Sequence, residues 1–402
     1  MDLSGLLELI KGLPAYRRLL DQLARGGDVG RARHVVLEAA KPYLIAGIQS
    51  DVPGAVLVLT AEAHHARRLC EGLAAWSGRP ERVLLFPGYR GLFYERVAAD
   101  PGTSQQRLGA LAALARPTPG LPAVVVVADV RSAMQRLPAP GSLVGRRFTV
   151  RRGENVGLQA LLERLVSLGF EPVTTVVEPG AFARRGGIVD FFPPGAELPF
   201  RVEFFGDEVD SIRVFEPSTQ RSLSHVEEAT IAPPRELTPD QSRLLASALV
   251  SVDLAGLAPE AAERWREDRE ALARGEASPL YEQYLSYYGS ASLLDFLDEG
   301  SLLVVDEPSS LGRAARALAE EAEALRGELV ARGELPRSLP RPYFTWEELS
   351  SRVSGRRQLV LDMEAAAEAS AHEAWPFSSV GSYGGRLKAA LDDCRTLLEQ
   401  GE

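Results

Sequence analysis

The chain has 402 residues, 45% hydrophobic and 25% charged, which is the composition of a globular protein with more than one domain. A formal net charge of -10 argues against a general nucleic-acid-binding surface, and no apolar run is long enough to cross a membrane. Only Cys70 and Cys394 are cysteines, which excludes a disulfide framework and a cysteine-based zinc site. The first residues lack a signal-peptide cleavage pattern, so we expect a cytoplasmic protein.

Residues 1–147 alternate between predicted strands and helices, a pattern that predicts a parallel sheet. The expected strands are 34–39, 55–62, 82–88 and 123–130, the expected helices are 63–76 and 104–115, and a loop is expected at 116–122. The apolar run at 55–62 is unbroken, which indicates a strand that is buried on both faces.

The pattern changes at Phe148. A strand and turn at 148–156 precede an amphipathic helix at 158–170, and short strand-like segments follow at 172–180, 186–195 and 200–218. Turn residues separate these segments, so the sequence predicts an antiparallel α+β module that closes near residues 229–236.

From about Pro239 onward the chain is helix-rich again. A buried strand is predicted within 302–310, a helix at 311–333, an apolar segment at 357–363 and a last helix at 386–402. That last helix ends abruptly, as expected of an engineered fragment or a truncated gene product.

Lys41 follows the first predicted strand, near the place where a P-loop lysine would fall. The residues before it include Glu38 and no glycine, Pro42 follows it, and no Ser or Thr is present to hold magnesium. Asp306 and Glu307, at the end of a predicted strand, resemble a Walker B pair. Without a P-loop we expect no nucleotide there, and capping of the following helix is the favoured interpretation.

Other catalytic patterns are not found. His64 and His65 are adjacent on a predicted helix and do not share a face, so both are interpreted as surface residues. The sequence contains no nucleophile elbow and no dinucleotide fingerprint, and we predict no catalytic residue, no cofactor and no metal site.

Residues 181–222 concentrate arginines and phenylalanines. In a strand at 200–205, Arg201, Glu203 and Phe205 share one face, while Val202 and Phe204 point toward a core. Arg and aromatic residues are enriched at binding hot spots, which favours a protein-binding face. Two alternatives stay open: a sheet covered on both faces with an internal Arg201–Glu203 ion pair, and a nucleic-acid-binding face, which the neighbouring acidic residues disfavour.

Residues 180–222 resemble the module shared by the bacterial excision-repair helicase UvrB and the transcription-repair coupling factor Mfd. The likeness rests on the long patterns G-A-F-A-R-R-G-G-I-V-D-F-F-P and V-E-F-F-G-D-E-V-D-S-I-R, and it extends to residues 84–114 and 292–308. The working P-loop of UvrB and its tyrosine-rich hairpin are missing here. The chain is therefore most similar to the N-terminal part of the coupling factor.

The resemblance implies an α/β fold: a degenerate P-loop-NTPase-like (RecA-like) parallel-sheet domain interrupted by an inserted α+β UvrA-binding module. Residues 1–147 and 233–377 would form the split domain, 148–232 the module, and 378–402 a linker or the start of a further domain. Glu38, Lys41, Asp306 and Glu307 would mark its decayed nucleotide site.

By the family motif, the UvrA contacts fall on Arg185, Arg201 and Phe205, with Glu203 and Asp207 as secondary contacts. The implied function is non-catalytic: recruitment of UvrA to RNA polymerase stalled at DNA damage, for nucleotide excision repair. Full-length relatives are ATP-dependent DNA translocases that also engage RNA polymerase and double-stranded DNA, and the chain stops before those domains. The alternative is an ATP-dependent, UvrB-like helicase or damage-recognition fragment.

Overall fold

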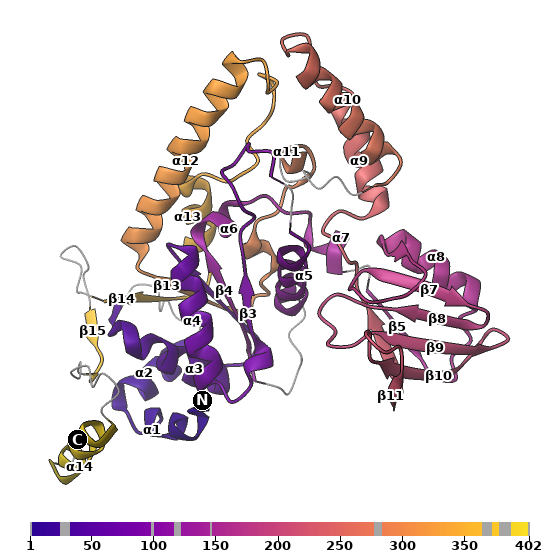
Figure 1. Cartoon of the computed structure of the whole chain (residues 1–402). Helices are drawn as coiled ribbons and strands as arrows, with labels where there is room; N and C mark the ends of the chain where they lie inside the picture. Colours follow the sequence, from indigo (N-terminus) through magenta and orange to yellow (C-terminus); the bar gives the residue numbers. More distant parts are fainter. Residues whose placement is uncertain are drawn as a thin grey trace.

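A computed structural model describes residues 2–24, 33–97, 100–115, 122–144, 147–276, 284–363, 372–377 and 387–400. It has a mixed α/β fold, as predicted, with a larger body built on a parallel sheet and a smaller body built on an antiparallel one (Figure 1). Within the described residues, no helix combines the length and the apolar character needed to span a bilayer.

The larger body contains a seven-stranded parallel sheet in the order β15-β1-β14-β13-β2-β4-β3. Its strands are β1 (Arg33–Val35), β2 (Ala55–Thr60), β3 (Val83–Phe86), β4 (Val124–Asp129), β13 (Leu302–Asp306), β14 (Gln358–Asp362) and β15 (His372–Ala374). Strands from before and after residues 148–232 therefore belong to a single sheet.

Helices cover both faces of this sheet. In β2, Leu57 and Leu59 join the core on one face, and Val56 and Val58 join the core on the other, which explains the unbroken apolar run. One core includes residues of α1 (Leu7–Ile10), α2 (Pro14–Ala24), α3 (Lys41–Asp51) and α4 (Ala63–Trp76). The other includes residues of α5 (Pro101–Ala115), α6 (Val130–Met134), α9 (Pro239–Leu249), α10 (Pro259–Ala273), α11 (Leu285–Tyr288), α12 (Pro308–Ala331) and α13 (Trp346–Ser354).

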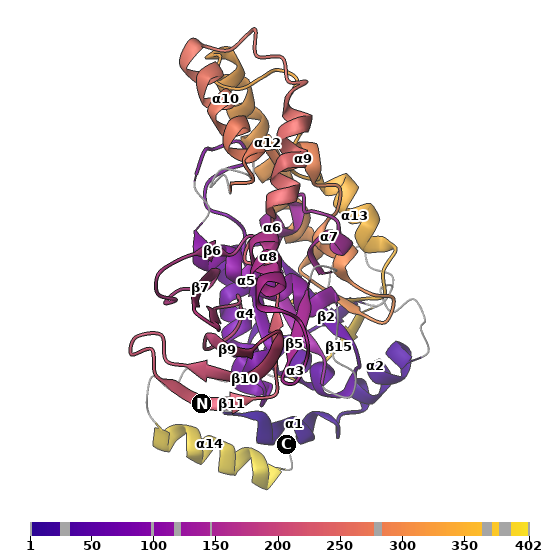
Figure 2. The same cartoon turned by 90° about the vertical axis from the view of Figure 1, so that its right-hand side faces the viewer.

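The remaining elements of this part are short, apart from the last helix. They are η1 (Ser4–Leu6), η3 (Glu38–Ala40), η4 (Pro80–Arg82), α7 (Pro140–Val144), η6 (Leu293–Phe296) and α14 (Leu387–Gln400). In both views α10 and α12 extend away from the sheet, and α14 lies apart from the larger body (Figures 1 and 2). The predicted loop at 116–122 and the predicted tail at 378–402 lie partly outside the described residues.

The smaller body is a six-stranded sheet in the order β11-β10-β9-β8-β7-β6, antiparallel except between β6 and β7. Helix α8 (Leu158–Leu168) and a two-stranded sheet, β5 (Phe148–Arg151) with β12 (Glu228–Ile231), share its main core. The six strands are β6 (Glu171–Pro172), β7 (Ala181–Arg185), β8 (Ile188–Phe191), β9 (Phe200–Phe205), β10 (Glu208–Phe215) and β11 (Ser222–Val226). We call this body, from Phe148 to Ile231, the module.

The prediction of a strand at 172–180 in the module is wrong. Only Pro172 belongs to a strand, and residues 173–180 form a loop. Two side chains fix this loop in place of a strand partner: Arg185 on β7 donates to the carbonyl of Thr174, and Gln220, between β10 and β11, donates to that of Val176.

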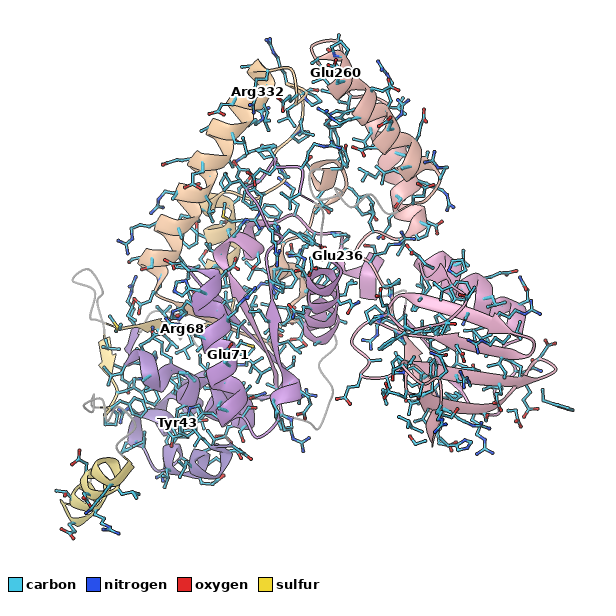
Figure 3. All side chains as sticks on the ribbon, viewed as in Figure 1. Tyr43, Arg68, Glu71, Glu236, Glu260 and Arg332 are labelled. Carbon is cyan, nitrogen blue, oxygen red and sulfur yellow. The ribbon has the colours of Figure 1, made fainter. Side chains whose placement is uncertain are left out.

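The chain enters and leaves the module at one place, because Phe148 and Ile231 lie opposite each other in the β5–β12 pair. Just beyond, the buried Glu236 accepts from Arg107 Nε of α5 at 2.6 Å and from the Tyr89 hydroxyl at 2.9 Å. Arg107 also donates to the side chain of Gln135 at 2.6 Å. Figure 3 shows Glu236 above α5, where the returning chain meets the larger body. A fully buried ion pair thus fixes the junction.

Candidate functional site

Strand β9 carries three of the predicted contact residues on one face of the sheet. Val202 is fully buried and Phe204 packs against the core that α8 shares, so alternate residues point the other way. Arg201, Glu203 and Phe205 therefore share the face opposite α8. We call this the outer face of the module.

Arg201 is held in place by Asp190 on the neighbouring strand β8. Its Nε and Nη2 donate to the two carboxylate oxygens at 2.7 and 2.9 Å, and Nη1 donates to the carbonyl of Gln220 at 3.1 Å. The guanidinium carbon lies 4.6 Å from the centroid of the Phe215 ring. The Asp190 side chain is 1% exposed and that of Arg201 is 15% exposed, so most of the Arg201 fork is engaged inside the module.

Glu203 takes part in a different ion pair from the one considered in the two-faced-sheet alternative. Instead of Arg201, its carboxylate accepts from Arg213 Nη2 at 3.1 Å and from the Ser211 hydroxyl at 3.0 Å. Sequence reasoning missed Arg213, which lies directly opposite Arg201 across the β9–β10 pair. Counting outward from the predicted turn at 206–207 would place Ile212 opposite Arg201, but a β-bulge between Val209 and Ser211 shifts the register by one residue, so the sequence held no signal for this partner.

Phe205 is the most exposed large apolar side chain among the described residues, with 82% of its surface open to solvent. It ends β9, immediately before a turn at Gly206, whose φ of 65° lies in the left-handed region. Asp207 follows, but its carboxylate lies beside Gly157 at the start of α8 rather than among the arginines. The structure thus brings Phe205 onto the outer face and leaves Asp207 at its edge.

Arg185 reaches the outer face from β7. It pairs with Ile188, which in turn pairs with Glu203, so these three residues form one row across three strands. The exposed Arg185 donates weakly to the carbonyl of Thr174, at 3.3 Å, and leaves other donors open to solvent. The 173–180 loop beside it adds two exposed apolar side chains that sequence reasoning missed, Val173 at 39% and Val177 at 52%.

A second group of predicted residues meets at the carboxyl end of the parallel sheet. Lys41, fully buried at the start of α3, has its Nζ 2.6 Å from Asp306, 2.9 Å from Glu307 and 3.0 Å from Glu38. Burial lowers the pKa of Lys41, but Asp306 and Glu307 raise it more, so the pKa stands above its ordinary value. The ammonium group is charged and surrounded by three carboxylates.

His65 completes this group, which we call the lysine cluster: Glu38, Lys41, His65, Asp306 and Glu307. Its Nε2 lies 2.9 Å from Asp306 and 3.2 Å from Glu38, and its pKa is raised by its interaction with Asp306. The interpretation of His65 as a surface residue is therefore wrong. Helix α4 turns it inward, and no spacing in the sequence indicates that partner.

Two more predictions, for His64 and Glu307, concern this end of the sheet. His64 is exposed beside Glu62, as predicted. The capping interpretation for Glu307 is wrong: it occupies the N-cap position of α12 with φ 53°, yet its side chain makes no capping bond. Its carboxylate accepts instead from Lys41 and, at 2.6 Å, from the backbone N–H of Met363. Among the described residues, no group of His, Cys, Asp and Glu has the geometry to hold a metal ion.

Comparison with known proteins connects the module to a family. Residues 148–237 match the family described as the UvrB interaction domain. The chain is similar to the transcription-repair-coupling factor of Bacillus subtilis, with 29% identity over 339 residues, which is 81% of this chain and 27% of that protein. The coupling factor of Myxococcus xanthus is 28% identical over 363 residues, which is 87% of this chain and 30% of that protein. The coupling factor of Escherichia coli K12 is 31% identical over 206 residues, which is 51% of this chain and 17% of that protein.

These matches confirm the predicted resemblance to the N-terminal region of the bacterial transcription-repair coupling factor. The chain spans less than a third of the length of the relatives named here.

Proposed function

We propose, from this resemblance to the N-terminal region of a transcription-repair coupling factor, that the chain acts in transcription-coupled repair by recruiting UvrA through the outer face of its module. The observation that carries the proposal is Phe205, 82% exposed on the face that also carries Arg185 and Arg201, within the segment that matches the UvrB interaction domain. An exposed aromatic side chain on a face that also carries arginines has the composition of a protein-binding hot spot.

The contact residues have different parts in this proposal. Phe205 would fill an apolar pocket on UvrA, and Arg185, whose donors are mostly open, would pair with a carboxylate there. Arg201 has fewer open donors because Asp190 holds its fork, so it both shapes the face and reaches the partner. Glu203 and Asp207 are proposed as secondary contacts.

A second part of the proposal is that this chain does not hydrolyse ATP. The support is the lysine cluster, in which three carboxylates already neutralise Lys41 at the position where phosphates would otherwise bind. A nucleotide would have to displace these carboxylates and bring its own negative charge beside them. This favours a decayed nucleotide site over the UvrB-like, ATP-dependent alternative.

The relatives are much longer than this chain, so the proposal extends to a full-length protein. We propose that a full-length protein carrying this chain acts in the cytoplasm on RNA polymerase stalled on double-stranded DNA, and that the module supplies the link to excision repair. Those partners would be engaged by regions other than the one described here.

The test is a calorimetric titration of the chain with purified UvrA, compared with Phe205→Ala. We expect wild-type binding and a loss of about 2 kcal/mol or more for Phe205→Ala, roughly 30-fold in Kd. Leu244→Ala is the matched control, because Leu244 on α9 is an apolar side chain that is 61% exposed and distant in the fold from the outer face. A folded wild-type chain that does not bind UvrA, or equal losses for both variants, would refute the proposal.

A further inference from the structure

The loop at 173–180 is anchored on the outer face of the module. Its residue Val176 is fully buried and belongs to a small core that is separate from the core shared with α8. The other members of this small core come from β7, from the residue after β8 and from β10: Ala181, Ala183, Phe192 and Phe215. Phe182, between the two alanines, belongs to the α8 core, so the alanines point to the outer face. Val176 therefore packs on the face that also carries Arg201 and Phe205.

Gln220 links this loop to Arg201. Its Nε2 donates to the carbonyl of Val176 at 3.0 Å and to that of Pro217 at 2.7 Å, and its own carbonyl accepts from Arg201 Nη1 at 3.1 Å. The φ of Gln220 is 61°, in the left-handed region, which a residue with a Cβ rarely adopts. A residue in this conformation is held there by its surroundings, and such residues gather at functional sites. One residue thus fixes both the backbone of the loop and the guanidinium of Arg201.

The second arginine of the outer face also contacts the loop. Arg185 donates to the carbonyl of Thr174 at 3.3 Å and to the Thr175 hydroxyl at 3.5 Å. Val177 follows the buried Val176 and is 52% exposed, so its side chain points away from the small core. The loop that binds both arginines, directly or through Gln220, therefore presents an exposed apolar side chain.

A stable protein interface needs more contact surface than Phe205 and two arginines provide. Such an interface covers about 800 Å² on each partner, whereas one aromatic side chain buries on the order of 200 Å². The loop continues the outer face in the direction away from Phe205. Arg201 lies four residues before Phe205 on β9, roughly 13 Å along the strand, and Gln220 joins Arg201 to the loop.

We propose that the UvrA-binding surface extends from Phe205 across the two arginines to the 173–180 loop, with Val177 as a second apolar anchor and Gln220 as a positioning residue. This inference rests on the proposed function, in which the outer face recruits UvrA. A loop that is already fixed loses little conformational freedom on binding, so its apolar side chain adds to the affinity. Gln220 acts by holding the loop and Arg201 in one relative position, not by touching UvrA.

The first test compares two valines of equal exposure. Val177→Asp should weaken UvrA binding about tenfold or more in a calorimetric titration, because a carboxylate replaces the apolar contact close to the UvrA acids proposed to pair with the arginines. The matched control is Val166→Asp. Val166 is also 52% exposed but belongs to α8, which covers the other side of the sheet (Figure 1), so the Kd should stay unchanged.

The outcomes separate this inference from the proposed function. A folded wild-type chain that does not bind UvrA would refute both. A wild-type chain that binds, and that is weakened by Phe205→Ala but not by Val177→Asp, would overturn the extension alone. Equal losses for Val177→Asp and Val166→Asp would also overturn it.

The second test asks whether Gln220 acts through the loop. Gln220→Met keeps a similar length without a donor, and hydrogen exchange should become faster in residues 173–180 while β8 and β9 keep their protection. It should weaken UvrA binding about fivefold in the wild-type and Phe205→Ala backgrounds. In a Val177→Ala background the effect should be less than about twofold, because the loop contact is already lost there. Equal effects in all three backgrounds would contradict the role given to Gln220.

Discussion

Arg201 and Phe205 share one strand face, but the module depends on them to very different extents. Arg201 neutralises Asp190, whose side chain is 1% exposed, and it lies over the ring of Phe215. Phe205 is 82% exposed, so most of its surface contacts solvent. A loss of UvrA binding in an Arg201 variant therefore has two possible causes, whereas a loss in a Phe205 variant has one.

This difference gives a prediction about stability. Arg201→Ala should lower the free energy of unfolding by about 3 kcal/mol, because the buried Asp190 carboxylate loses its partner. Phe205→Ala should change it by less than about 0.5 kcal/mol. Urea unfolding followed by circular dichroism measures both values. In the double variant Arg201→Ala/Asp190→Ala the loss should be smaller than in Arg201→Ala alone; an equal or larger loss would show that Asp190 is not the residue left unpaired.

At the scale of elements, the lysine cluster holds together the ends of segments that are far apart in the chain. It joins the starts of α3, α4 and α12 to the end of β13, through Lys41, His65, Glu307 and Asp306. Burial raises the pKa of Asp306, but His65 and Lys41 lower it more, so the carboxylate stays ionised. The cluster therefore links these segments through ion pairs between charged side chains.

The cluster predicts a pH dependence of stability. The folded-state pKa of His65 is raised above 6.5, so protonated His65 contributes stability below that value and loses it as pH rises through the folded-state pKa. His65→Gln should remove this contribution, on the order of 1 kcal/mol at about pH 6, the scale of one partly exposed ion pair. The difference between wild type and variant should shrink by about pH 9.

Urea unfolding at several pH values measures that difference. Burial lowers the pKa of His34, which gives the opposite pH trend, but both proteins share it and it cancels in the comparison. The lowered pKa of Asp306 affects stability only near and below pH 3.8, outside this window. A difference that stays constant from pH 6 to pH 9 would contradict the role given to His65.

The sequence predicted those parts of the fold that repeat with a fixed period. The alternation in β9 placed Arg201, Glu203 and Phe205 on one face, and the apolar run of β2 indicated burial on both sides. Contacts between distant segments have no such period. The ion pairs of His65 with Asp306 and of Arg201 with Asp190 depend on how the chain packs, and the loop at 173–180 forms because distant side chains satisfy its carbonyls.

At the scale of the whole molecule, the junction between the two bodies rests on the pair Arg107–Glu236, in which both side chains are fully buried. The guanidinium carbon of Arg107 lies 4.3 Å from the centroids of the Phe86 and Tyr89 rings. Glu236 follows the last strand of the module by only a few residues, so the orientation of the module depends on this contact.

Removing that partner should loosen the junction. Glu236→Ala leaves the buried Arg107 without its carboxylate and should lower the free energy of unfolding by about 4 kcal/mol. Hydrogen exchange should become faster in α5 and in residues 232–237, while strands β7–β10 keep their protection. Glu227→Ala is the control, because that side chain is 81% exposed and should leave both measurements unchanged. Equal loss of protection in β7–β10 would show that the two bodies unfold as one unit.

The position of β13 has a consequence for how the chain folds during synthesis. β13 lies between β2 and β14, so the middle of the parallel sheet cannot close until residues near 306 have left the ribosome. All strands of the module come from residues 148–231, so the module can fold before residues near 306 are synthesised. We therefore expect the module to be structured while the body that carries it is still open. In a growing chain, the outer face would therefore form before the parallel sheet of the larger body is complete.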